Sequence, residues 1–170
     1  MKNILIVFLA VCSIVTYAQQ SPVEKVIDKF DGKAGISVQD ISSGTETWDK
    51  LMKTDKVELR EVLAKMETLK IVNCDTKEAS LSTCKKFHEK LDNSVEDKRY
   101  AEILQVHGDD GEQVGFHISQ LEDGSLREVV LLVDQGKGFL LVYMKGTIDM
   151  SSLNLGDIMS AFSGKPGEKD

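Results

Sequence analysis

Two almost unbroken apolar runs, residues 129–133 and 139–144, lie in the second half of the chain on either side of residues 134–138. Successive residues of a strand face opposite sides of a sheet, so an unbroken apolar run predicts a strand that is buried on both faces. Gly136 and Gly138 suit a tight turn between the two runs. We therefore expect antiparallel neighbours at the centre of a sheet. Either helices cover both faces, or one face is left for a partner or ligand.

The surrounding sequence extends this pair into a larger sheet. Short turns rich in Asp, Glu and Gly separate the last four predicted strands, and turns this short impose antiparallel pairing as a meander. Two further strands are expected earlier in the chain. The predicted strands are residues 35–41, 69–74, 101–107, 112–120, 126–134 and 139–146.

Helical spacing of apolar residues accounts for much of the rest. Ser21-Pro22-Val23-Glu24 has the composition of a capping box, and the helix it begins should end at Asp31-Gly32. The other predicted helical stripes are Trp48, Leu51 and Met52; Leu59, Val62, Leu63 and Met66; and a closing helix with Leu155, Ile158, Met159 and Phe162. The predicted fold class is α+β, with an antiparallel meander sheet of about four to six strands packed against several amphipathic helices.

The amino terminus predicts export. Residues 1–18 combine a positive start, an apolar run and a small-x-small site, which indicates a secretory signal peptide that is cleaved after Ala18. The alternative, a lipoprotein acylated on Cys12, is disfavoured because Val11 is large. Residues 19–163 are predicted to form a single α+β domain with a disordered tail at 164–170, located in the periplasm or associated with the cell envelope.

Charge and hydropathy exclude several partners. The formal net charge is −7 and basic residues are scattered, so the sequence lacks the basic surface that nucleic acids require. No run after the leader approaches the ~20 apolar residues of a membrane span, so none is expected in the mature chain. The acidic balance favours solubility.

Two cysteines, Cys74 and Cys84, remain after cleavage in a compartment that should be oxidising, which favours a disulfide. If a helix began at Asp75, Cys84 would instead lie ~12 Å along it, beyond the reach of a disulfide. The bond therefore requires residues 75–82 to form a loop. From the sequence alone both arrangements stay open.

The sequence offers few candidate catalytic or metal-binding residues. Cys84 and His88 are one helical turn apart, so a catalytic thiolate-imidazole pair is conceivable. With Cys74 they would also supply three zinc ligands, but a closed structural zinc site needs four. His107 and His117 flank a predicted turn and should lie ~15 Å apart, too far to share a metal. The turn itself, residues 109–112, lacks the ligand spacing of an EF-hand calcium loop. The adjacent charges at 127 and 128 are interpreted as rim charges.

Three segments together resemble a known family. They are F-D-G-K-A-G at 30–35, L-R-E-V-V-L-L-V at 126–133 and L-V-Y-M-K-G-T-I-D-M at 141–150. The pattern is similar to the exported Bacteroidetes proteins grouped as domain of unknown function 4252, over most of the mature chain. The resemblance implies a small exported α+β domain. That family has no established activity, so no catalytic residue is carried over.

These observations predict an exported cell-envelope protein that acts as a non-enzymatic binding or accessory module. Its partner would be an envelope protein or a hydrophobic ligand held between sheet and helix. The alternative is an envelope hydrolase or a thiol-dependent enzyme that uses Cys84 with His88. No catalytic residue, metal ligand or cofactor is assigned from the sequence, and the only covalent feature proposed is the Cys74–Cys84 disulfide.

Overall fold

The computed structural model describes residues 20–53, 57–75, 80–108, 113–134 and 138–149. Several predicted features lie wholly or partly outside these residues: the leader, the loop at 75–82, the turns at 109–112 and 134–138, the closing helix and the tail.

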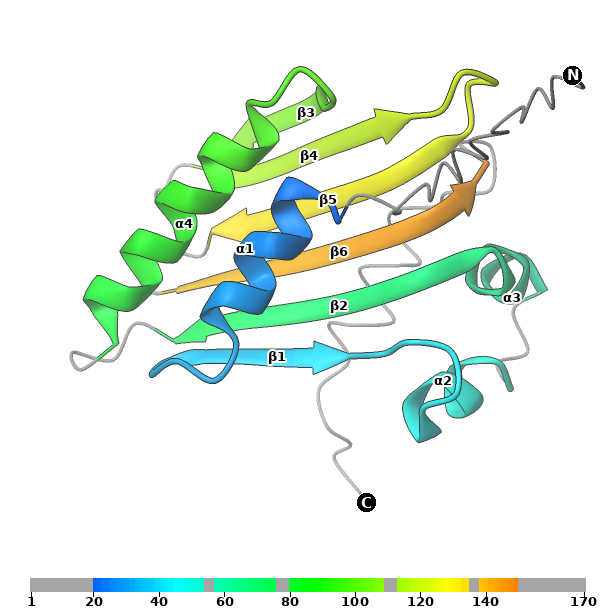
Figure 1. Ribbon diagram of the computed structural model, residues 1–170, viewed down its shortest axis with the longest axis horizontal. Helices are drawn as coiled ribbons and strands as arrows, with labels where there is room; N and C mark the ends of the chain where they lie inside the picture. Colours follow the sequence, from blue (N-terminus) through cyan, green and yellow to red (C-terminus); the bar gives the residue numbers. More distant parts are fainter. Residues whose placement is uncertain (1–19, 54–56, 76–79, 109–112, 135–137, 150–170) are drawn as a thin grey trace, which may run out of the picture.

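A six-stranded antiparallel sheet forms the framework of the protein (Figure 1). Its strands are β1 (Ile36–Asp40), β2 (Met66–Asp75), β3 (Ala101–His107), β4 (Gln113–Gln120), β5 (Leu126–Asp134) and β6 (Gly138–Ile148). They lie in the order β1-β2-β6-β5-β4-β3. The two apolar strands, β5 and β6, therefore occupy the centre, and β3 to β6 form the predicted meander.

The register explains why both central strands are apolar on both sides. Leu131 lies opposite Val142, and Val130 opposite Tyr143, so alternate pairs face opposite sides of the sheet. Val142 belongs to one buried cluster and Tyr143 to the other. The sheet thus has a hydrophobic cluster on each face, and a charge placed at either kind of position would be buried.

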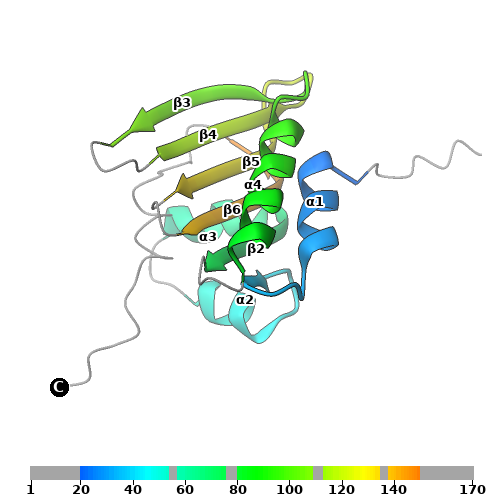
Figure 2. The same cartoon turned by 90° about the vertical axis from the view of Figure 1, so that its left-hand side faces the viewer.

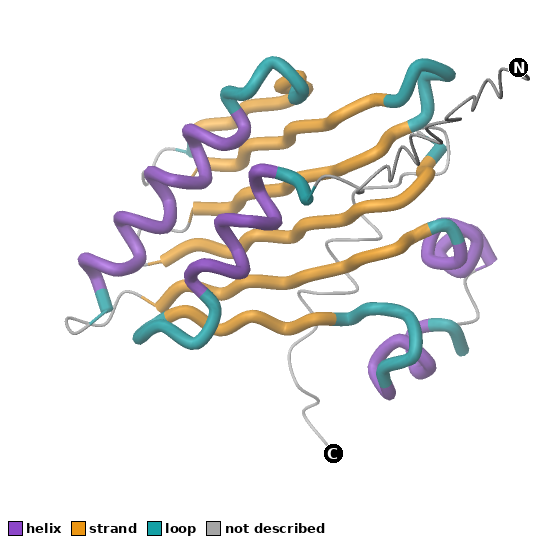
Figure 3. The backbone as a smooth tube through the Cα atoms, viewed as in Figure 1, coloured by secondary structure: helices purple, strands orange, loops and turns teal. Residues whose placement is uncertain are grey.

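Two helices, α1 (Pro22–Phe30) and α4 (Leu81–Val95), run side by side and obliquely over one face of the sheet (Figures 2 and 3). Ser21 begins α1 as predicted, because its hydroxyl accepts a hydrogen bond from the Glu24 backbone N–H at 2.9 Å. The cluster on this face consists of Val23, Ile27, Phe30, Ile36, Val72, Cys74, Cys84, Phe87, Leu91, Val130, Phe139, Leu141 and Tyr143.

Two shorter helices, α2 (Glu46–Leu51) and α3 (Val57–Ala64), lie near the end of the sheet where β2 begins (Figure 1). Thr45 caps α2 by accepting a hydrogen bond from the Trp48 N–H at 3.2 Å. Trp48, Val62 and Leu63 belong to the second cluster, together with strand residues such as Met144. This cluster contains Ile41, Trp48, Val62, Leu63, Met66, Leu69, Ile71, Phe116, Ile118, Leu126, Val129, Leu131, Val142, Met144 and Ile148.

One boundary differs from the prediction. The helical spacing of residues 59–66 predicts that Met66 belongs to a helix, but α3 ends at Ala64 and Met66 is the first residue of β2. Met66 is buried at the irregular start of the β2–β6 ladder, where it lies opposite Gly146. An apolar residue four positions after Val62 fits a helix and also a buried strand end, and here the pairing with β6 decides between them.

Candidate functional site

A disulfide joins Cys74, at the end of β2, to Cys84 in the first turn of α4, with the two Cα atoms 5.9 Å apart. The sequence left this bond open because a helix beginning at Asp75 would have carried Cys84 too far away. The helix begins at Leu81 instead, so Cys84 is only its fourth residue. The disulfide is therefore confirmed, and it links sheet to helix where both elements are buried.

The bond also determines what the cysteines can do. Their exposed fractions are only 4% for Cys74 and 2% for Cys84, so the disulfide lies within the core. Neither sulfur is a thiolate, so the hypothetical Cys84–His88 nucleophile and the three-ligand zinc site both lose their sulfur ligands. Within the described residues, no group of three or more His, Cys, Asp and Glu side chains is arranged to hold a metal ion.

A groove lies beside the disulfide, between α4 and the segment where β5 ends and β6 begins. Its volume is about 380 Å³, which is within the range of small-ligand pockets. Leu81, which is 41% exposed, and Phe139 supply an aliphatic and an aromatic side chain to the lining. The lining residues are Leu81, Cys84, Lys85, His88, Glu89, Asp92, Asp134, Gly138 and Phe139.

His88 is the lining residue with the most contacts described around it. Its Nδ1 lies 2.8 Å from Oδ2 of Asp92, one turn further along α4, and its Nε2 lies 3.8 Å from Oδ2 of Asp134, at the end of β5. The ring meets Phe139 edge to face, with the centroids 5.4 Å apart. The hydrogen bond to Asp92 raises the pKa of His88, and the charges of Asp92 and Asp134 add to this, while partial burial opposes it.

The groove is lined by both apolar and acidic side chains. The carboxylates of Glu89, Asp92 and Asp134 outnumber the single ammonium group of Lys85, and His88 adds a positive charge only when it is protonated. Such a surface favours a ligand with an apolar body and a positively charged group. Within the described residues, His88 contacts two carboxylates and an aromatic ring, which is not the arrangement that activates a nucleophile.

Sequence reasoning found part of this site. Cys84 and His88 were placed on one helical stripe, and Asp92 was detectable as a carboxylate four residues after His88. Asp134 had no local signal, since its position beside His88 depends on how α4 packs across the sheet.

The other two histidines do not contribute to the groove. His107 lies opposite Gln113 and His117 opposite Glu102, so the structure does not bring the two imidazoles together, as predicted. His117 faces the side of the sheet that α4 covers. Burial lowers its pKa, against the smaller opposing effect of nearby carboxylates.

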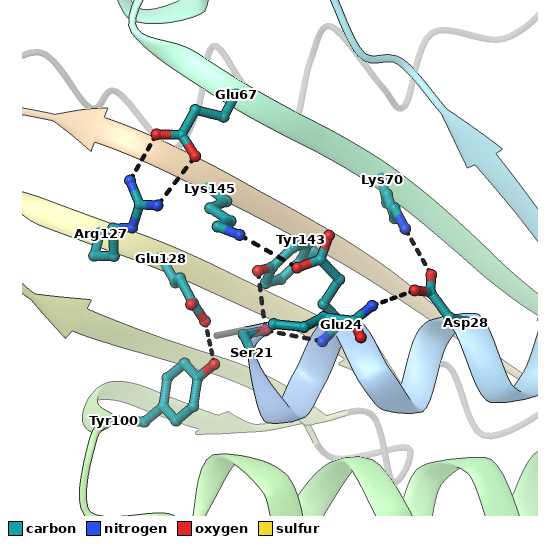
Figure 4. Close-up of polar contacts among 11 residues, drawn as sticks. Ser21, Glu24, Asp28, Glu67, Lys70, Tyr100, Arg127, Glu128, Tyr143 and Lys145 are labelled. Atoms are coloured by element: carbon teal, nitrogen blue, oxygen red, sulfur yellow. Dashed lines mark hydrogen bonds and ion pairs between the residues drawn. The ribbon is translucent and has the colours of Figure 1, made fainter. Parts of the chain in front are cut away.

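A second set of polar contacts lies around the start of α1 (Figure 4). Arg127 forms a two-pronged ion pair with Glu67, with N–O distances of 2.7 and 3.1 Å, and is the rim charge that the sequence predicted. For Glu128 the prediction of a rim charge is wrong, because this residue is buried and accepts a hydrogen bond from the Tyr100 hydroxyl. Burial and the bond to Glu128 raise the pKa of Tyr100.

The same set of contacts fastens α1 to the sheet. Lys70 on β2 pairs with Asp28 at 2.7 Å, and Lys145 on β6 pairs with Glu24 at 3.4 Å. The Tyr143 hydroxyl hydrogen-bonds to Ser21 at 3.0 Å. Among the described residues, no buried side-chain nitrogen or oxygen lacks a hydrogen-bond partner. These groups are engaged with one another, so we interpret them as anchors of the helix rather than as a reacting centre.

Fold and groove together define a class: small α+β domains in which an open antiparallel sheet carries two helices and a ligand-sized groove on one face. More particularly, the chain belongs to the family described as a domain of unknown function, DUF4252, whose model matches residues 35–155. The match runs from the residue before β1 to beyond β6 and confirms the domain family to which the sequence was found similar. Searches of curated proteins and of solved structures gave no match. In the described part of the chain, no helix has the length and apolar character needed to cross a membrane.

Proposed function

We propose that the protein is a non-enzymatic binding module that is exported to the cell envelope. The observation that carries this proposal is the groove beside α4, which combines a volume of about 380 Å³ with a partly exposed leucine and three carboxylates. Export rests on the leader at residues 1–18. The disulfide supports export as well, because such bonds persist mainly in oxidising compartments.

The chemistry of the groove suggests the class of ligand. An aromatic or aliphatic group would lie against Leu81 and Phe139, while a primary amine would lie among the carboxylates of Asp134, Asp92 and Glu89. Neutral and anionic analogues would bind less well, because they gain no electrostatic attraction from the carboxylates of the lining.

His88 makes this binding depend on pH. Loss of its proton removes one positive charge from the groove lining, so a cationic ligand should bind more tightly as pH rises through the pKa of His88. By linkage, a bound cation should lower that pKa by the corresponding amount.

Isothermal titration with 3-phenylpropylamine tests the proposal, with 3-phenylpropanol as the neutral analogue. We expect the amine to bind more tightly than the alcohol. Asp134→Asn should lower the affinity for the amine by about fivefold, which is the upper end of the range for a partly exposed ion pair. Asp49→Asn removes the same charge from the exposed side of α2 and serves as the matched control.

Two further variants separate the parts of the groove. Leu81→Ser should lower the affinities for the amine and the alcohol by the same factor, because it removes an apolar contact that both ligands make. His88→Gln should make amine affinity nearly independent of pH between about 6 and 8, the range in which histidine titrates. Equal affinities of amine and alcohol, or equal effects of Asp134→Asn and Asp49→Asn, would contradict the proposed ligand class.

Export has its own test. The mature protein recovered from envelope fractions should begin at Gln19, and the mass of its first peptide measures this. A protein that retains residues 1–18 and stays with the cytosolic fraction would overturn the proposed location without bearing on the groove.

A further inference from the structure

A second hollow lies on the other side of α4, where the end of α1 packs against it. Its volume is about 350 Å³. Phe30 forms part of its floor and is fixed by edge-to-face contact with Phe87, with the ring centroids 5.1 Å apart. Thr83 adds a half-buried hydroxyl group. The hollow and the acidic groove share Glu89 in their linings, but their other lining residues on α4 differ: Leu81, Cys84, Lys85, His88 and Asp92 for the groove, and Thr83, Lys86 and Lys90 for the hollow.

Four lysines surround this hollow: Lys29 and Lys33 from the end of α1, and Lys86 and Lys90 from α4. All four are exposed. Within the described part of the chain, none of their ammonium groups forms an ion pair with a carboxylate. Glu89 is the one acidic residue among the described lining residues.

This concentration of positive charge departs from the rest of the molecule. The whole chain carries a formal net charge of −7, yet the lining of this hollow is net positive by three. Lys86 and Lys90 are also one helical turn apart, where like charges repel and slightly destabilise a helix. An anion in the hollow would relieve that repulsion. The sequence concealed the patch, because its lysines come from two segments that only the fold brings together.

We propose that the hollow binds a ligand that carries several negative charges on phosphate groups. Lysine ammonium groups are compact, strongly hydrated point charges that suit phosphate oxygens. Four of them around one concave surface favour a ligand with more than one charge over a single carboxylate. Thr83 can donate a hydrogen bond from its hydroxyl group. Both a soluble polyphosphate and a phosphorylated lipid headgroup offer this chemistry.

Titration of the mature protein with inorganic pyrophosphate, followed by calorimetry, tests the proposal. We expect pyrophosphate to bind more tightly than sulfate. The double variant Lys86→Glu/Lys90→Glu should lower the affinity for pyrophosphate by about tenfold or more, given the strength of hydrogen bonds to charged groups. Lys50→Glu/Lys53→Glu makes the same change of charge at α2, away from the hollow, and should have little effect.

Vesicles separate the two sources of phosphate. Phosphatidylcholine vesicles with and without phosphatidic acid would show whether the protein prefers a headgroup, and the same double variant should abolish any such binding. The proposal is overturned if neither pyrophosphate nor phosphatidic acid binds, or if the two double variants weaken binding equally, since that would indicate only general charge attraction. Because the residues are exposed, circular dichroism should show all variants folded. Asp134→Asn should leave pyrophosphate binding unchanged, which keeps this test independent of the proposed amine ligand.

Discussion

The Ser21 hydroxyl joins two parts of the molecule, since it caps α1 through the Glu24 N–H and also hydrogen-bonds to the buried hydroxyl of Tyr143 on β6. Tyr143→Phe removes the second bond, which should lower the free energy of unfolding by about 1 kcal/mol. Ser21→Ala loses the cap as well and should cost more, about 1 to 2 kcal/mol. Urea denaturation of both single variants and of the double variant measures these costs. The double variant should lose less free energy of unfolding than the two single variants lose in sum, because both substitutions remove the same hydrogen bond. Strictly additive losses would show that this bond does not contribute to stability.

His88 should titrate above its ordinary pKa of 6.5, because Asp92 and Asp134 favour the protonated ring. A pKa raised by folding stabilises the protein fully below the unfolded value, and this contribution is lost as pH rises through the folded value. The stability advantage of the wild type over His88→Gln should therefore shrink between about pH 5.5 and pH 8, where histidine titrates. NMR titration of the ring protons measures the pKa directly. Asp92→Asn should lower it, and an unchanged value in that variant would contradict the assigned hydrogen bond.

Single residues were the hardest scale to predict from the sequence. Ser21 was recognisable as a cap because its signal is local. Glu128 was not recognisable as buried, since a charged residue at the start of a strand is usually exposed and its partner Tyr100, just before β3, is 28 residues away in the sequence. Asp134 and the four lysines of the hollow likewise acquire their neighbours only through tertiary packing.

At the scale of elements, the disulfide fixes the end of β2 to the start of α4. Replacing both cysteines by alanine should lower the free energy of unfolding by ~2 to 3 kcal/mol, the value expected for a short closed loop. Guanidinium denaturation with and without reductant measures this, and the double variant should no longer respond to reductant. A wild type whose unfolding midpoint is unaffected by complete reduction would contradict the structural importance of the bond.

The turn between α1 and β1 gives a second prediction. Gly35 has a φ of +79°, and a Cβ there would clash with Ser80 and lie 2.8 Å from the carbonyl oxygen of Asp75. Gly32 has a similar φ of +72°, but nothing lies within 4 Å of a Cβ added there. Gly32→Ala should cost roughly 1 kcal/mol from backbone conformation alone. Gly35→Ala should cost about 1 to 3 kcal/mol more through the clash, and thermal unfolding compares the two. Equal costs would mean that the contact with Ser80 can relax freely.

Element boundaries could be predicted where two local signals agreed. Apolar runs bounded by Asp-Gly and Gly-Lys-Gly turns located β5 and β6, and helical spacing with a serine cap located α1. The start of α4 was left open, because Asp75 and Glu78 resemble a cap while the cysteine pair favours a loop. The disulfide resolves this conflict only once the geometry is known.

For the molecule as a whole, the two-faced apolar character of β5 and β6 was the most informative signal. It predicted that both strands lie inside the sheet, and the strand order confirms this.

Strand β3 lies at an edge of the sheet and has three exposed apolar residues, Ile103, Leu104 and Val106. The irregularity between Glu102 and Leu104 interrupts its ladder, as bulges often do at sheet edges. Sequence patterns therefore predicted the architecture, while the charges that distinguish the two sides of α4 depended on the fold.

Chemical-shift mapping shows whether the groove between α4 and the start of β6 is the binding site. In amide NMR spectra of the mature protein titrated with 3-phenylpropylamine, the largest changes should fall on Leu81, Lys85, His88, Asp134 and Phe139. They should saturate, and they should weaken in Asp134→Asn. Changes that never saturate, or that centre on residues far from α4 and the start of β6, would contradict the account.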